Sequence, residues 1–248
     1  MKSSFLSLVV FLFLLPLSPS LFAQKSESDS LSFKKNEIGW MFSDLIDGSL
    51  YFSYERYLKN KWTIGVNIGY KTPEGLINLS GIDTDKIQTS DVNYSGFKIT
   101  PTVRYYINSA SDYKMDGFYV GAYAKLSGFQ SNISMDYTDP NQNMYSLGFD
   151  ASVNTYSLGL MIGYKLPINQ RFGLDFLFIG LGKARYSFKL NSNSTIPDDF
   201  YTDLNAALNS ITLLDLIKSQ DFNINHIDNR SGFFGTAARY GITLTYAF

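Results

Sequence analysis

The feature that most constrains this chain is a two-residue alternation that recurs along most of its length and is interrupted by turn-forming residues. In the stretch 62–72, for example, Trp62 and Ile64 alternate with Thr63 and Gly65. Successive side chains of a strand point to opposite faces, so this period predicts strands with one apolar and one polar face. Eight such segments occur, at 36–45, 49–57, 62–72, 94–107, 117–130, 153–166, 172–188 and 237–248.

The connections between the segments alternate in length after a tight turn at Asp47-Gly48. Short turns at one end and long loops at the other are typical of outer-membrane barrels, in which an even strand count leaves both chain ends in the periplasm. The sequence therefore predicts an all-β fold over 36–248, an eight-stranded antiparallel up-and-down transmembrane β-barrel. The short connections are 59–61, 108–116 and 167–171, and the long ones are 73–93, 131–152 and 189–236.

The two faces of the strands indicate which solvent each one meets. Mid-strand charges lie on the face rich in glycine, serine and threonine, and the opposite face carries many of the 18 Tyr and 20 Phe residues. An eight-stranded barrel encloses only its own side chains, so these aromatic rows cannot all point inward. Outward rows of this kind suit lipid and would aggregate in water. The pattern favours a membrane barrel over a soluble, lipocalin-like barrel, whose faces would be reversed.

The N-terminal segment predicts export. Lys2 is followed by an apolar run and then by Ala23, which is the layout of a secretory signal peptide over 1–23. An uncleaved anchor is the alternative, although the run is shorter than the ~20 residues of a spanning helix. The polar stretch 24–35 is expected to be a flexible periplasmic segment. The sequence has no cysteine, which excludes disulfides and cysteine-ligated metals, and 21 Lys and Arg against 22 Asp and Glu give no field that favours nucleic acid.

Several stretches carry a resemblance to a known group of proteins. They are KITPTVRYYI (98–107), GFYVGAYAKLSGF (117–129), GLMIGYKLPINQRFGLDFLFIGLG (159–182) and the closing GITLTYAF (241–248). The chain resembles the small outer-membrane β-barrels of the OmpA and OmpX superfamily, and more closely an uncharacterised family of such barrels common in Bacteroidetes. The resemblance implies the architecture and implies no particular chemistry.

The inward-facing charges are the first candidate site. Toward the periplasmic end we expect a lumenal network of paired charges, because buried charges need partners. Toward the other end, a group of cations would form a mouth that attracts an anion, such as a phosphate of lipopolysaccharide or a small acidic solute, unless Asp83, Asp85, Asp136 or Asp139 fold in to neutralise it. The expected network is Glu55, Arg104, Lys165 and Asp175, and the expected mouth is Lys71, Lys98, Lys125, Lys183, Arg185 and Arg239.

The loop 189–236 holds two further candidates. Phe200, Leu204 and Leu208 recur at helical spacing, which predicts one amphipathic helix near 195–219 that covers the mouth, contacts lipid or a partner, or packs on neighbouring loops. His226 is the only histidine, and a triad with Asp228 and Ser231 lacks any recognised spacing. We therefore expect no enzymatic activity, no metal site and no cofactor.

The last strand completes the sequence-based picture. Its apolar face resembles the C-terminal signal that the bacterial barrel-assembly machinery recognises, which makes that machinery an expected partner beside outer-membrane lipid. The sequence favours a structural or surface-binding role in the outer membrane of a Gram-negative bacterium. A narrow porin-like channel is the alternative, and a lipid-modifying enzyme is less favoured. The apolar face of this strand consists of Tyr240, Ile242, Leu244, Tyr246 and Phe248.

Overall fold

A computed structural model describes the chain from the first predicted strand to the last residue, with gaps. The described residues are 34–75, 81–89, 92–107, 115–192, 195–197, 199–210, 224 and 229–248. The predicted signal peptide at 1–23 and His226 lie outside them. Among the described residues, no helix is long and apolar enough to cross a membrane.

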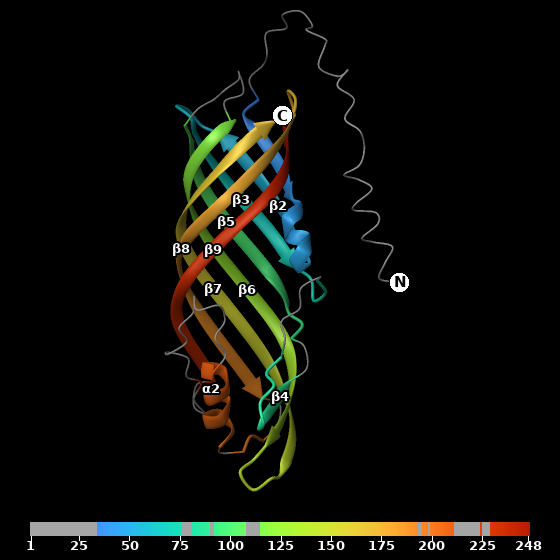
Figure 1. Cartoon of the computed structure of the whole chain (residues 1–248). Coiled ribbons are helices and arrows are strands. Elements are labelled where there is room, and N and C mark those ends of the chain that lie inside the picture. The colour runs from blue at the N-terminus through green and yellow to red at the C-terminus, as the bar shows by residue number, and fades with distance from the viewer. Residues whose placement is uncertain are drawn as a thin grey trace, which may run out of the picture. The chain divides into compact units, whose positions relative to one another are not determined.

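Eight antiparallel strands form a closed ring, in which each strand pairs with its neighbours and the first pairs with the last (Figure 1). The prediction of eight antiparallel strands is confirmed. The amide of Phe248 donates to the carbonyl of Asn36 at 2.9 Å, so the chain end is tied into the seam. The strands are β1 (Asn36–Met41), β2 (Ser49–Tyr57), β3 (Trp62–Lys71), β5 (Ser95–Tyr106), β6 (Gly117–Thr138), β7 (Met144–Pro167), β8 (Phe172–Ser192) and β9 (Arg230–Ala247).

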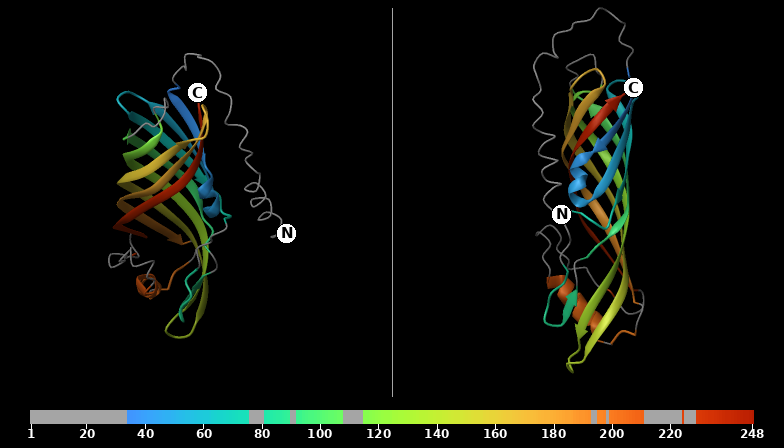
Figure 2. Two further views of the ribbon diagram at one scale, coloured as in Figure 1. Left: turned by 45° about the horizontal axis from the view of Figure 1, so that its top comes forward. Right: turned by 90° about the vertical axis from the view of Figure 1, so that its right-hand side faces the viewer.

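The strands differ greatly in length, and this divides the molecule into two regions. β6, β7 and β8 have 22, 24 and 21 residues, whereas β1, β2 and β3 have 6, 9 and 10. Beyond the ring, the long strands continue as a curved sheet at the end remote from the C-terminus (Figures 1 and 2). We call this part the extension; it comprises 128–138, 144–154, 183–192 and 230–237 with β4 (Ile87–Thr89) and α2 (Phe200–Ser210).

The extension corrects two boundaries of the sequence-based prediction. The expected long loop 131–152 is mostly strand, because β6 and β7 continue to Thr138 and from Met144. Only 139–143 forms the turn, in which the Asp139 carboxylate accepts hydrogen bonds from the amides of Asn141 and Asn143, both at 2.8 Å. The helix expected near 195–219 is present as α2, and 211–219 lies outside the described residues.

A second correction concerns the first strand, which was expected to reach residue 45. β1 ends at Met41 and is followed by a 3-10 helix, η2 (Phe42–Asp47), so α2 is not the only helical element of the described chain. Gly48 closes η2 with a φ of 79°, a left-handed conformation that glycine adopts without strain. The Ile242 amide donates a hydrogen bond to Ser43 Oγ at 3.1 Å. This contact joins η2 to β9 beyond the point where the pairing of β1 with β9 ends.

A β-bulge interrupts β8 and changes which side chains face inward. Gly163 and Ile162 of β7 pair with Leu177 and Ile179, so Phe178 is an extra residue on β8. The register with β9 shifts at the same place. Because side chains alternate along a strand, one extra residue inverts the facing of every residue beyond it. The sequence-based assignment of faces therefore holds on β8 only as far as the bulge.

The polarity of the two faces reverses between the ring and the extension. In the ring, β7 directs Tyr156, Leu158, Leu160 and Ile162 outward, and Leu160 is 72 % exposed. In the extension, between residues 146 and 152, the outward side chains of the same strand are polar, whereas the inward ones are apolar and buried; Met144, next to the turn, is exposed. The outward set is Ser146, Asp150, Ser152 and Asn154, and the inward set is Leu147, Phe149 and Ala151.

Candidate functional site

Charged side chains from four strands meet inside the ring. Arg104 Nη1 lies 3.1 Å from Glu55 Oε2 and 2.6 Å from Asp175 Oδ2. Lys165 Nζ lies 2.8 Å from the same Glu55 oxygen. All four residues are at least nine-tenths buried. The structure thus brings together the four charges that the sequence placed in a lumenal network.

Three further residues complete this network and were missed in the sequence. Glu37 of β1 lies 3.1 Å from Lys165 Nζ, and the hydroxyl of Tyr106 donates to Glu55 at 2.9 Å. Tyr119 donates to Asp175 Oδ1 at 2.8 Å, and its ring lies 4.5 Å from the Arg104 guanidinium. Glu37 shares the inward parity of Gly39, and the register that sets it opposite Glu55 depends on η2, which takes the place of the tight hairpin expected at Asp47-Gly48. The tyrosines carry no such signal, because most aromatic residues of the ring face outward.

Tyrosine rings fill the space left by inward glycines. The rings of Tyr119 and Tyr123 lie so close to Gly163 and Gly159 that a Cβ atom on either glycine would overlap them. A small cavity beside Arg104 is lined by polar side chains and has room for about one water molecule. The interior of the ring is therefore a packed polar core. This core holds its charged side chains in fixed ion pairs.

The inward cations at the other end of the ring have aromatic and acidic neighbours. Lys98 Nζ lies 3.4 Å from Asp44 Oδ2 and 3.2 Å from Asp47 Oδ2, which η2 turns toward the lumen. Lys71 lies over the Tyr94 ring and Arg239 over the Tyr123 ring, at 4.7 and 5.0 Å. Lys125 is half-buried on the same inward face of β6. Lys98 thus has its acidic partners on η2, and the four candidates named from the loops are not those partners.

Lys183 and Arg185 do not join these cations. They lie beyond the β8 bulge, and both side chains are exposed on the outer face. The residue between them, Ala184, is the one that points inward, with 1 % exposure. This placement corrects the sequence-based assignment of both residues to the mouth. The physical reason is the extra residue Phe178, which inverts the alternation for the rest of the strand.

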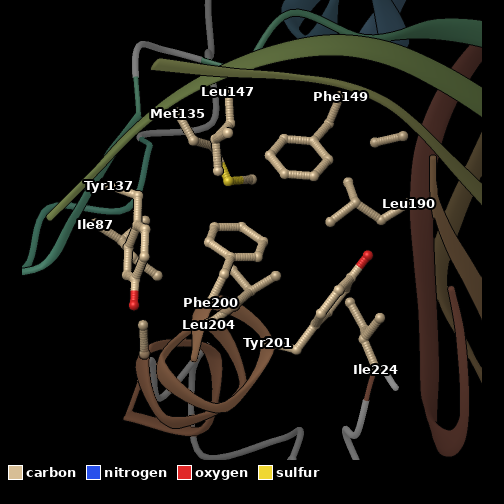
Figure 3. Close-up of a cluster of buried hydrophobic side chains, with 12 residues drawn as sticks. Ile87, Met135, Tyr137, Leu147, Phe149, Leu190, Phe200, Tyr201, Leu204 and Ile224 are labelled. Atoms are coloured by element: carbon tan, nitrogen blue, oxygen red, sulfur yellow. The ribbon is translucent and has the colours of Figure 1, made fainter. Parts of the chain in front are cut away.

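The extension encloses a hydrophobic cluster under α2 (Figure 3). The Phe200 ring stacks on that of Phe149 at a centroid distance of 5.2 Å and meets the Tyr137 ring edge-on at 5.3 Å. The apolar residues whose helical spacing predicted α2 are thus the ones that pack it against the sheet. The buried members are Ile87, Met135, Tyr137, Leu147, Phe149, Ala151, Leu190, Phe200, Tyr201, Leu204, Ala207 and Ile224.

Polar contacts fix α2 in this position. Asp203, in the first turn of the helix, accepts a hydrogen bond from Lys86 Nζ at 2.7 Å and another from the Tyr137 hydroxyl at 3.0 Å. Burial, together with the hydrogen bond to the Asp203 carboxylate, raises the pKa of Tyr137, so the phenol stays protonated as a donor. We call Lys86, Tyr137 and Asp203 the α2 latch. Asn205 exchanges two hydrogen bonds with the backbone of Ile224, at 2.8 and 2.9 Å, and so secures the helix to the returning chain.

The residues considered for a catalytic triad do not form a site within the described part of the chain. His226 and Asp228 lie outside the described residues, and Ser231 is buried on β9. Within the described part of the chain, no cluster of acidic, histidine or cysteine side chains is arranged to hold a metal ion.

The fold and its interior define a class, a closed antiparallel ring of eight strands with a packed polar lumen. The family model described as a protein of unknown function, DUF3575, matches residues 9–193, and the chain belongs to this family. The matched residues include β1 to β8, whereas α2 and β9 lie beyond them. No curated protein and no solved structure matches the chain significantly.

Proposed function

We propose that the protein is an integral outer-membrane β-barrel of a Gram-negative cell envelope, as its resemblance to OmpA-like barrels implies. In this arrangement the ring crosses the membrane, both chain ends are periplasmic, and the extension projects from the cell surface. The role is structural or surface-binding, without enzymatic activity. The closing strand presents Tyr240, Leu244 and Phe248 outward, which suits recognition by the barrel-assembly machinery.

The observation that carries this proposal is the reversal of polarity along single strands. In water, a strand would place its apolar face inward, as β7 does over 146–152 of the extension. The ring does the opposite, and its outward aliphatic and aromatic residues need an apolar solvent. On β8 the apolar outward stretch runs over 172–182 and matches the roughly 9–11 residues that a tilted strand needs to cross hydrocarbon.

The packed lumen argues against the alternative of a narrow channel. Tyr106, Tyr119 and Tyr123 are almost fully buried across the interior, together with the ion pairs of Arg104 and Lys165. An open pore would need these side chains to leave their partners. In planar bilayers we expect no steady conductance, and ohmic channels would favour the alternative.

A pair of lysine substitutions on one face of β7 tests the membrane assignment. Leu160→Lys places a charge on the outward face of the ring, where lipid contact would cost about 2–4 kcal/mol. Asn154→Lys places the same charge on the outward face of the extension. We expect Leu160→Lys to reduce the amount of folded protein in the outer-membrane fraction severalfold and Asn154→Lys to leave it unchanged. Equal yields of both variants, or wild-type protein that stays soluble without detergent, would refute the proposal.

A further inference from the structure

Four cations lie together on the outer face of the extension, on two adjacent strands. Lys183 and Arg185 occupy successive outward positions of β8, Lys189 follows on the same face after Ser187, and Arg230 of β9 lies directly opposite Lys189. The β8 bulge places the first three there, since without it they would point inward. We call these four residues the outer cationic patch. Successive outward residues of a strand are about 7 Å apart, so Lys183 and Arg185 can reach one anionic group, and the pair of Lys189 and Arg230 lies about 13 Å further along the same face.

The patch lacks acidic partners among the described residues. No described carboxylate lies within ion-pair distance of any of its four side chains. Asp150 is on the same face but opposite Asn191, one outward position beyond the residue that pairs with Lys189. Like charges directly opposite each other, as Lys189 and Arg230 are, destabilise a sheet. The clustered positive charge therefore favours binding of an anion.

The patch also begins where the apolar outer face of the ring ends. Leu181, 52 % exposed, is the last apolar outward residue of β8, and Lys183 is the next outward position. Arg185 lies opposite Tyr156 on one side and Phe234 on the other, and its guanidinium is 5.9 Å from the Phe234 ring. Phe234 is 73 % exposed. A ligand that suits this surface has a phosphate directly above an apolar chain, which is the structure of a phosphorylated lipid.

We propose that the outer cationic patch binds the phosphorylated headgroup of a lipid in the membrane leaflet on the side of the extension, with the acyl chains on the ring below. Arginine forms bidentate hydrogen bonds with phosphate, and lysine supplies a point charge. This inference rests on the proposed membrane location and goes beyond it, because it assigns a specific lipid site to residues that were expected to line the lumen.

The experiment compares two matched double variants of the full chain, each purified folded in a non-ionic detergent. Lys183→Gln with Arg185→Gln removes half of the patch. Lys59→Gln with Arg171→Gln removes one lysine and one arginine that are exposed at the opposite end of the ring. Native mass spectrometry measures binding of lipid A and of its dephosphorylated form. We expect the patch variant to lose at least about tenfold in affinity for lipid A, a change of about 1.4 kcal/mol. The control variant should match wild type, and removal of the phosphates should weaken wild-type binding to the same extent.

Three results would overturn the inference. They are unchanged binding in the patch variant, an equal loss in the control variant, and equal affinity for the dephosphorylated lipid. Inorganic phosphate is tested as a competitor, and displacement of lipid A by millimolar phosphate would assign the patch to a soluble anion instead. Failure here is distinct from failure of the membrane assignment. A protein that passes the Leu160→Lys test yet shows no phosphate preference is a membrane barrel without this lipid site.

Discussion

The ring and the extension share the same long strands but bury opposite kinds of side chain. The ring encloses ion pairs around Arg104 and exposes its aliphatic residues, whereas the extension encloses Phe149 and Phe200 and exposes its polar residues. Backbone hydrogen bonding is continuous across the boundary. Strand pairing and the distribution of polar and apolar side chains are therefore set separately. Strand pairing depends on backbone hydrogen bonds. Which side chains face inward depends on what surrounds that part of the strand.

The two regions should also differ in how they respond when a central contact is lost. The two tryptophans of the chain, Trp40 of β1 and Trp62 of β3, both belong to the ring. Their fluorescence therefore follows unfolding of the ring, and amide hydrogen exchange in α2 follows the extension.

The largest effect is expected from Arg104→Met. This change leaves Glu55 and Asp175 buried without their shared partner, which typically costs about 3–5 kcal/mol. We expect the denaturant midpoint from tryptophan fluorescence to fall accordingly. Arg185→Met is the matched control, since that side chain is exposed on the outer face, and its effect should stay within about 0.5 kcal/mol. Similar midpoints for the two variants would mean that the ion pairs do not hold the ring.

Phe200→Ala should have a comparable but local cost. Truncation of a buried phenylalanine costs about 3–5 kcal/mol, and here the loss falls on docking of α2. Amide exchange in α2 should become much faster, while the tryptophan transition of the ring remains where it was. Thr202→Ala, an exposed position of the same helix, should change neither. If Phe200→Ala shifted the ring transition as far as Arg104→Met does, the two regions would be one cooperative unit.

Asp203→Asn should weaken the α2 latch to a smaller degree. The variant loses the charge that meets Lys86, whose side chain is half-exposed, and it weakens acceptance from Tyr137, so we expect about 1 kcal/mol. Exchange in α2 should be faster than in wild type and slower than in Phe200→Ala. Tyr137→Phe should reproduce part of this effect. Unchanged exchange in both variants would leave the hydrophobic cluster as the whole basis of docking.

The smallest effect concerns the turn 139–143 and depends on pH. Hydrogen bonds from the Asn143 side chain and backbone lower the pKa of Asp139. A lowered pKa in the folded chain means that the turn is stabilised above the ordinary aspartate pKa of about 3.9, and that this stabilisation is lost as the pH falls through the lowered value. A carboxyl-carbon NMR titration should place Asp139 below its ordinary range, and Asn143→Ala should move it back up. An Asp139 pKa that is equal in both proteins would contradict this account.

Sequence reasoning identified the strands well because their two-residue period is a local property. It also placed Glu55, Arg104, Lys165 and Asp175 together, since inward parity and strand direction suffice for side chains near the end of the ring that has short turns. It failed where a bulge inverts the alternation of inward and outward side chains, and where the apolar face of a strand changes from the outer to the inner side. No residue type marks Phe178 as a bulge, so Lys183 and Arg185 were assigned to the wrong face. The segment 131–152 was taken as a loop because its apolar residues lie on the face that is polar in the ring.

Local sequence patterns were enough to predict that eight strands would pair in order, which faces of the ring's strands would be apolar, and which residues would form the apolar face of α2. These features depend on the alternation of polar and apolar residues in strands and on helical spacing, and both are properties of short stretches of sequence. The end of β1 at η2, the extra residue of β8, and the continuation of the long strands past the ring into a second core became visible only in the folded chain. Those features depend on how segments far apart in the sequence share hydrogen bonds and volume, and no single stretch encodes that balance.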